Sequence, residues 1–83
     1  MDIPPVAAFA IAAHANEFGV PKEQIAVVRV ERKDWPDSSL GCPEPGRAYL
    51  SVITSGYRII LAAAGKEYEY HTNDMTMAVR CPR

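Results

Sequence analysis

The sequence predicts an α+β domain in which one N-terminal helix packs on an antiparallel meander of four to five strands. Two observations lead to this fold class: a single segment with helical spacing at the N-terminus, and short β-rich segments separated by turn residues in the rest of the chain. Because helix and strands are segregated along the chain, the sheet should be antiparallel. With no internal repeat and no linker, the 83 residues are predicted to form a single domain, 1–83.

The N-terminal segment has the signals of a helix start and a helix end. Pro4 and Pro5 precede an alanine-rich run, and proline suits the first turn, where no intrahelical N–H bond is lost. Gly19 suits a left-handed C-terminal cap, and Pro21 prevents continuation. We therefore expect a helix from about Pro5 to Phe18. Its apolar face, from spacings of three and four, should carry Ala8, Ile11, Ala15 and Phe18, flanked by Val6 and Phe9.

The remaining β-rich segments are bounded by turn residues. We expect strands at 25–33, 48–54, 57–63, 67–72 and 76–81. The expected turns are Ser55-Gly56, Ala64-Gly65-Lys66 and Asn73-Asp74. The residues expected to face the helix are Val28, Val30, Leu50, Val52, Ile59 and Leu61.

Residues 67–72 alternate cleanly between two faces of their strand. One face should hold Tyr68, Tyr70 and Thr72. The other, expected to be solvated, should hold Glu67, Glu69 and His71. Glutamates that point the same way do not face each other across a cleft, as acid–base chemistry requires, so we assign them no catalysis.

The most distinctive part of the sequence is residues 35–49, WPDSSLGCPEPGRAY, which hold too many proline, glycine and serine residues for regular structure. Four residues are expected to support this loop: Trp35, Asp37, Ser38 and Tyr49. Trp35 should fold over the edge of the core, the alternative being a partly exposed binding anchor. Asp37 and Ser38, with Ser39, should form a turn capped by their own side chains.

The tip of this loop is the candidate binding surface. Pro43, Pro45 and Gly46 restrict the backbone around Glu44, and a loop that is rigid before binding loses little entropy on binding. The same stiffness would equally protect a small domain from proteolysis. The candidate tip residues are Leu40, Gly41, Pro43, Glu44, Pro45 and Gly46.

The two cysteines, Cys42 and Cys81, are expected to form a disulfide, because a chain this short buries only about 60% of its unfolded surface. Closing a loop of about 40 residues would stabilise the fold by roughly 4 kcal/mol. The alternative is two unpaired thiols in a cytosolic protein. With His14 and His71 the cysteines make a nominal zinc set, but without short ligand spacings, so we expect no metal and no cofactor. A Cys42–His71 nucleophilic pair lacks the local signature of a thiol hydrolase.

Composition and charge exclude several classes of partner. A net charge of −1 with scattered basic residues argues against nucleic acid. No stretch approaches the ~20 apolar residues of an integral membrane span. Residues 6–15 resemble a signal-peptide core, but the preceding residues lack a positive charge, so we expect mature sequence.

Four motifs carry a resemblance to known proteins: GVPKEQI (19–25), WPDSSLGCPEPG (35–46), GYRI (56–59) and YEYHT (68–72). Together they resemble a group of small, functionally uncharacterised bacterial domains often found behind signal or lipoprotein leaders. The resemblance implies an extracytoplasmic setting, which would support the disulfide, but it supplies no reaction, cofactor or partner. One helix on a meander is also similar, more loosely, to cystatin-like and PepSY-like modules, which include protease inhibitors and peptidase-modulating domains.

The sequence therefore favours a non-catalytic extracytoplasmic binding module, a candidate protease inhibitor or peptidase-modulating domain, that contacts a protein partner through the disulfide-anchored loop 35–47. The alternative is a structural or assembly subunit of a cell-envelope complex whose sheet edges pair with other chains. Enzymatic activity is not expected. The oligomeric state is left open.

Overall fold

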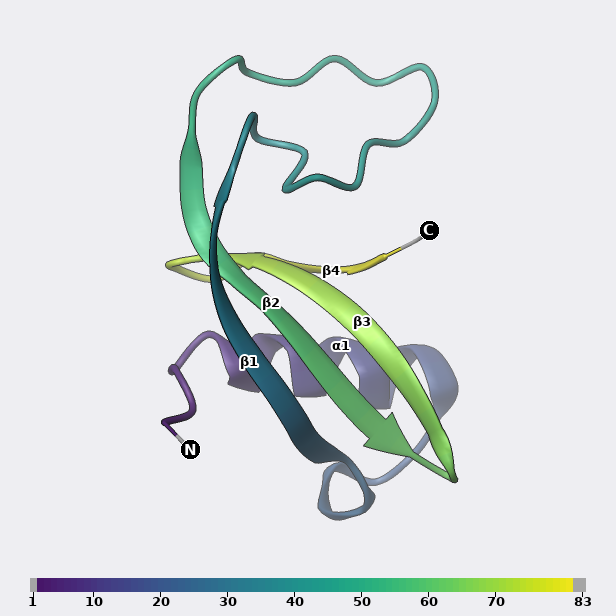
Figure 1. Cartoon of the computed structure of the whole chain (residues 1–83). Coiled ribbons are helices and arrows are strands. Elements are labelled where there is room, and N and C mark those ends of the chain that lie inside the picture. Colours follow the sequence, from purple (N-terminus) through teal and green to yellow (C-terminus); the bar gives the residue numbers. More distant parts are fainter. Residues whose placement is uncertain (1, 82–83) are drawn as a thin grey trace.

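The computed structural model describes residues 2–81 and confirms the α+β prediction (Figure 1). A helix and a short 3-10 turn precede four strands, which pair antiparallel in the order β1-β2-β3-β4. The elements are α1 (Ala7–Phe18), η1 (Lys22–Gln24), β1 (Ala26–Trp35), β2 (Thr54–Ala63), β3 (Lys66–Asn73) and β4 (Ala78–Cys81). Helix α1 crosses one face of the sheet, and the long loop between β1 and β2 extends beyond the end of these strands (Figure 1).

Helix α1 begins two residues later than predicted and ends as predicted. Pro4 and Pro5 form a turn before the helix, in which the Pro4 carbonyl accepts a bond of 3.0 Å from the Ala7 N–H. At the other end Gly19 is left-handed, with φ of 66°, and its N–H donates to the Ala15 carbonyl. Over residues 2–81, no helix combines the length and the apolar character needed to cross a membrane.

The predicted apolar face of the helix was wrong by about one residue. Ala7, Ala10 and His14 are buried, whereas Phe9 and Phe18 are 45% and 41% exposed; Ala8 is exposed as well. Small side chains face the sheet because β3 fills the interface with its own aromatic rings: Tyr68 and Tyr70 both lie against the His14 ring. Of the predicted face, Ile11 and Ala15 do pack on the core, and the flanking Val6 is buried.

The predicted strand at 48–54 and the predicted turn at Ser55-Gly56 are wrong. Residues 54–63 form one continuous strand, β2, while residues 48–53 belong to the loop. Gly56 lies inside β2, opposite Asn73, where a Cβ atom would collide with the Thr72 carbonyl oxygen. The glycine is therefore needed for close approach of two strands rather than for a turn.

The core confirms part of the predicted helix-facing set. Ile59 and Leu61 are fully buried, and Val30 packs against the same cluster. Val28 is 42% exposed, because the register shifts at a bulge between Val27 and Arg29 and Val28 is the extra residue. Leu50 and Val52 lie in the loop and are 69% and 52% exposed, so their predicted place in the core was wrong.

Candidate functional site

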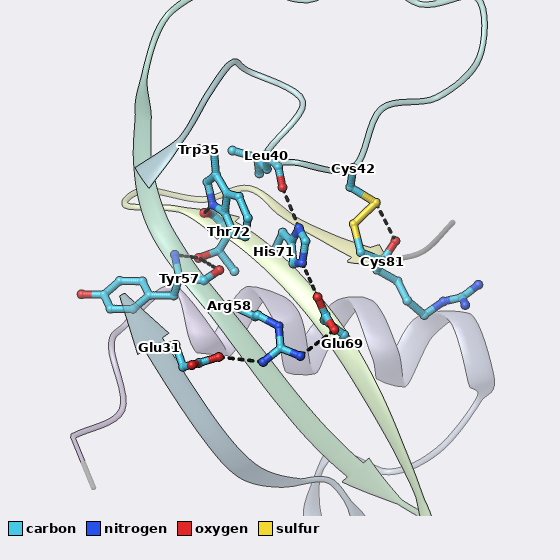
Figure 2. A network of polar contacts seen from close by, with 11 residues as sticks. Glu31, Trp35, Leu40, Cys42, Tyr57, Arg58, Glu69, His71, Thr72 and Cys81 are labelled. Atoms are coloured by element: carbon cyan, nitrogen blue, oxygen red, sulfur yellow. Dashed lines mark hydrogen bonds and ion pairs between the residues drawn. A yellow bond between two sulfur atoms is a disulfide. The ribbon is translucent and has the colours of Figure 1, made fainter. Parts of the chain in front are cut away.

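The long loop is held on the sheet face away from α1, beginning at Trp35. This side chain is 8% exposed, and its ring stacks on His71 with ring centroids 4.2 Å apart and an interplanar angle of 18°. The indole Nε1 donates to the Thr72 carbonyl at 2.9 Å (Figure 2). Trp35 therefore covers the edge of the core, as expected, and is not an exposed anchor.

The first turn of the loop is capped by Asp37, as predicted. Its Oδ1 accepts bonds from the Ser39 hydroxyl at 2.5 Å and from the Ser39 N–H at 2.9 Å. Both bonds lower the pKa of the Asp37 carboxyl, and the bond from the Ser39 hydroxyl has the larger effect. Ser38 joins the two limbs of the loop: its N–H donates to the Leu50 carbonyl at 3.0 Å, and its hydroxyl accepts from the Leu50 N–H at 2.8 Å.

Leu40 and Gly41 reverse the chain above His71. Both are left-handed, with φ of 60° and 71°, and the Cys42 N–H donates to the Ser39 carbonyl at 3.1 Å, the pattern of a type I′ turn. A Cβ atom at Gly41 would come within 2.9 Å of the Trp35 ring. Leu40 is 1% exposed, so the structure moves it from the predicted tip surface into the support of the loop.

His71 connects this turn to a chain of charged groups across the sheet. Its Nδ1 donates to the Leu40 carbonyl at 2.6 Å, and its Nε2 lies 2.6 Å from Glu69 Oε2 (Figure 2). Glu69 Oε1 accepts from Arg58 at 2.9 Å, and Arg58 also donates to Glu31 at 2.6 Å. The Arg58 guanidinium is the main cause that lowers the pKa of Glu69.

The predicted solvated face of Glu67, Glu69 and His71 is confirmed at Glu67, is half-buried at Glu69 and was wrong at His71. The alternation along β3 is as predicted, but His71 is only 7% exposed, because the loop folds over this end of the face. Sequence reasoning also missed Arg58 and Glu31. They lie directly opposite each other on β1 and β2, and only the strand register, which the sequence does not provide, brings them together.

The disulfide between Cys42 and Cys81 is present, with Cα atoms 5.9 Å apart, and both residues are buried. His14 lies on the other side of the sheet, bonded through Nδ1 to the Tyr70 hydroxyl at 2.9 Å. Burial is the first cause that lowers the pKa of His14, and it raises that of Tyr70 to about 12. The nominal zinc set is therefore not assembled, and residues 2–81 contain no group of three or more acidic, histidine or cysteine side chains placed to hold a metal.

The predicted tip is a tight turn that the flanking residues hold in place. The Arg47 N–H donates to the Glu44 carbonyl at 3.2 Å, and Gly46 has a φ of 83°, which makes residues 44–47 a type II turn with Pro45 in its first central position. The Glu44 N–H donates to the Tyr49 hydroxyl at 2.9 Å, so Tyr49 supports the loop as expected. Pro43, Pro45 and Gly46 are exposed, as is Arg47, which the sequence did not single out.

Hollows lie on both sides of the turn at residues 44–47. One, of about 430 Å³, lies between residues 47–50 and the side chains of Met77 and Val79. The other, of about 520 Å³, lies between residues 41–45 and the side chains of Glu69 and His71. The loop thus presents a turn with a hollow on each side.

Comparison with protein families shows which family the chain belongs to. Residues 7–81, from the start of α1 to the second disulfide cysteine, match a family described as a domain of unknown function, DUF8738. No curated protein and no solved structure gives a significant match to the chain. The matched segment contains the helix, the four strands and the whole loop, and the chain therefore belongs to the DUF8738 family.

Proposed function

We propose that this domain is a non-catalytic, extracytoplasmic binding module that contacts a protein partner through the tip of the loop 35–47. The observation that carries the proposal is a turn at residues 44–47 that is fixed before any partner arrives while its outer residues stay exposed. Cys42 holds one side of the turn through the disulfide, and the Tyr49 hydroxyl holds the Glu44 N–H. A surface ordered in advance loses little conformational entropy on binding.

The polar groups beside the loop support binding rather than catalysis. Both ring nitrogens of His71 are engaged, one with the Leu40 carbonyl and one with Glu69. The two oxygens of Glu69 are engaged with Arg58 and His71. Groups that satisfy one another in this way build the loop, whereas a catalytic acid or base needs an atom directed at its substrate.

The disulfide supports an extracytoplasmic location for the domain. A buried cysteine pair that joins the loop to the last strand is stable in an oxidising environment such as the periplasm or the cell surface. The tip would be fully ordered only where this bond persists.

The sheet edges are less suited to contact a partner, which argues against the assembly-subunit alternative. Edge strand β1 contains the bulge at Val28 and presents charged side chains, including Arg29 and Lys33. The other edge, β4, has four residues and is fastened to the loop at Cys81. Bulges, charges, shortness and covering loops all hinder edge-to-edge pairing.

The test uses the oxidised domain, the tip variant Glu44→Ala/Pro45→Ala and the control variant Lys66→Ala/Glu67→Ala, which changes an exposed charged pair at the β2–β3 turn. Each protein is immobilised against a displayed peptide library, and each is assayed as an inhibitor of serine, cysteine, aspartic and metalloproteases. We expect ligands or inhibited proteases whose affinity falls at least about tenfold, about 1.4 kcal/mol, in the tip variant alone. Binding that is equal in all three proteins, or no binding at all, would remove the tip from consideration.

A further inference from the structure

The hollow between residues 47–50 of the loop and β4 is a groove with mainly apolar walls. These walls include Tyr49 and Leu50 from the loop and Met77 and Val79 from the sheet side, and the volume is about 430 Å³. Among residues 2–81, Arg47 is the only charged residue that lines it. The described walls therefore combine apolar surface with one cation and no carboxylate.

Several apolar side chains beside this groove are exposed to solvent. Leu50 is 69% exposed and Met77 is 49% exposed, and the next loop residues Val52 and Ile53 are 52% and 78% exposed. The backbone at Leu50 is not loose, because Ser38 holds both its N–H and its carbonyl. Fixed apolar groups that gather at a groove mark a contact surface, because covering them removes apolar area from water.

Arg47 determines the charge that the groove accepts. Its guanidinium lies 3.3 Å from one Glu44 oxygen, and its side chain is 62% exposed. An exposed pair of this kind is weak, and a guanidinium has five N–H donors in a planar fork that suits a second carboxylate. None of the described lining residues is acidic, although the Asp37 carboxylate lies against Ser39. An incoming carboxylate would therefore compete with Glu44 for the Arg47 guanidinium.

One hydroxyl in the lining suits a peptide better than a purely apolar ligand. Ser38 is half-buried, and its Oγ accepts the Leu50 N–H. A hydroxyl has one donor and two acceptor positions, so this group can still donate to a peptide carbonyl. Ser39 is buried and bonded to Asp37, so it shapes the wall of the groove.

We propose that this groove binds an extended segment of a partner protein in which a large apolar side chain stands within three residues of an Asp or Glu. The apolar side chain would cover Leu50, Met77 and Val79, and the carboxylate would pair with Arg47. The proposal rests on the proposed function, because the binding loop forms one wall of the groove, and it names the kind of partner sequence that this loop recognises.

The test measures fluorescence anisotropy with a synthetic array of labelled glycine–serine decapeptides. Each carries one central Leu or Phe and one Asp placed one to three positions away on either side, with matched peptides in which Asn replaces Asp or Ala replaces the apolar residue. We expect at least one acidic peptide to bind at least about fivefold more tightly than its Asn partner, which corresponds to about 1 kcal/mol. Arg47→Gln should abolish that preference, and Leu50→Ser should weaken binding at least about tenfold.

Both substitutions change exposed side chains, so their thermal midpoints should match that of the parent protein. An array in which no peptide binds, in which acid and amide peptides bind alike, or in which Arg47→Gln keeps the preference would overturn the groove proposal. Glu44→Ala/Pro45→Ala separates the two proposals. If it abolishes binding of selected ligands while the array stays silent, the tip stands and the groove falls. If the array behaves as expected and this variant changes nothing, the groove stands and the tip falls.

Discussion

The two faces of the sheet are covered in different ways. On one face α1 packs on apolar side chains such as Ile59 and Leu61, and most of the contact is non-directional. On the other face the loop is held by a ring stack, by hydrogen bonds to particular atoms, and by a disulfide. Both faces take side chains from β3: Tyr70 faces the helix, and His71 faces the loop.

The difference shows what each covering requires of the sequence. Apart from the buried His14–Tyr70 hydrogen bond, the helix face is apolar and tolerates other apolar residues of similar volume, since such packing has no donors or acceptors to match. The loop face does not, because the Leu40 carbonyl needs a donor at His71 and the Trp35 ring leaves no space for a Cβ at Gly41. The loop is thus specified by residue identity and the helix by pattern.

The largest expected effect is the loss of the disulfide. We expect Cys42→Ala/Cys81→Ala to lower the free energy of unfolding by about 4 kcal/mol, because the unfolded chain regains the entropy of an open loop of about 40 residues. Urea denaturation of the oxidised protein, the reduced protein and the variant measures this. The variant should match the reduced protein, and far-ultraviolet circular dichroism should retain the helix and sheet. A loss below about 1 kcal/mol would show that the polar contacts alone hold the loop.

The second prediction compares two neighbouring isoleucines of β2 that face opposite sides of the sheet. Ile59 is 0% exposed and belongs to the core under α1, whereas Ile60 is 9% exposed beside Arg58 and Glu69. We expect Ile59→Ala to cost about 3 kcal/mol and Ile60→Ala about 2 kcal/mol, because a cavity near the surface fills with water or mobile side chains. Denaturation curves measure both, and an equal or reversed order would contradict the assignment of the core to the helix face.

A third prediction concerns the loop face alone. His71→Phe keeps an aromatic ring against Trp35 but leaves the buried Leu40 carbonyl without the donor it has now. We expect a loss of about 2 kcal/mol, together with faster amide hydrogen exchange at residues 40–42. Exchange on α1 serves as the internal control and should change only with global stability. An unchanged loop would mean that the ring stack, and not the hydrogen bond, positions Leu40.

The smallest expected effect is a slope of stability with pH from the helix face. Burial lowers the pKa of His14 below its usual 6.5, an effect that Glu17 opposes and Arg80 adds to. The unfolded chain then binds the proton more readily, so stability is complete above about pH 6.5 and falls as the pH drops through the folded-state pKa. We expect His14→Gln to flatten the change in unfolding free energy between pH 7.5 and pH 5.5. An identical slope in both proteins would assign the dependence to other groups.

Local signals in the sequence were sufficient for much of the fold. Gly19 and Pro21 predicted the end of the helix, residues 64–66 the β2–β3 turn, and the alternation in 67–72 the two sides of β3, all of which depend on neighbouring residues only. The capped turn at Asp37 and the pairing of Cys42 with Cys81 were also predictable.

The errors arose where a distant strand decides the outcome. Ser55-Gly56 has the composition of a turn, yet Gly56 is in a strand because the Thr72 carbonyl lies where its Cβ would be. Val28 fits an inward pattern, but the bulge, visible only in the register with β2, turns it outward. For the candidate site, the contact of Trp35 with His71 joins residues that no local signal connects. The motif at residues 35–46 could be recognised from the sequence, whereas its contact with His71 on β3 could not.

The position of β4 in the chain has a consequence for the order of folding. Cys81 closes the disulfide on the loop side, and its neighbour Arg80 makes a two-bond ion pair with Glu17 of α1, at 2.8 and 3.0 Å, on the helix side. During synthesis β4 emerges after every other described element. The disulfide and this ion pair therefore cannot form before β4 has emerged. Oxidation then fixes an arrangement that the contacts of the loop with β3 have already established. In refolding from the reduced state, we expect the sheet to form first and the loop to be secured in a later, thiol-dependent phase.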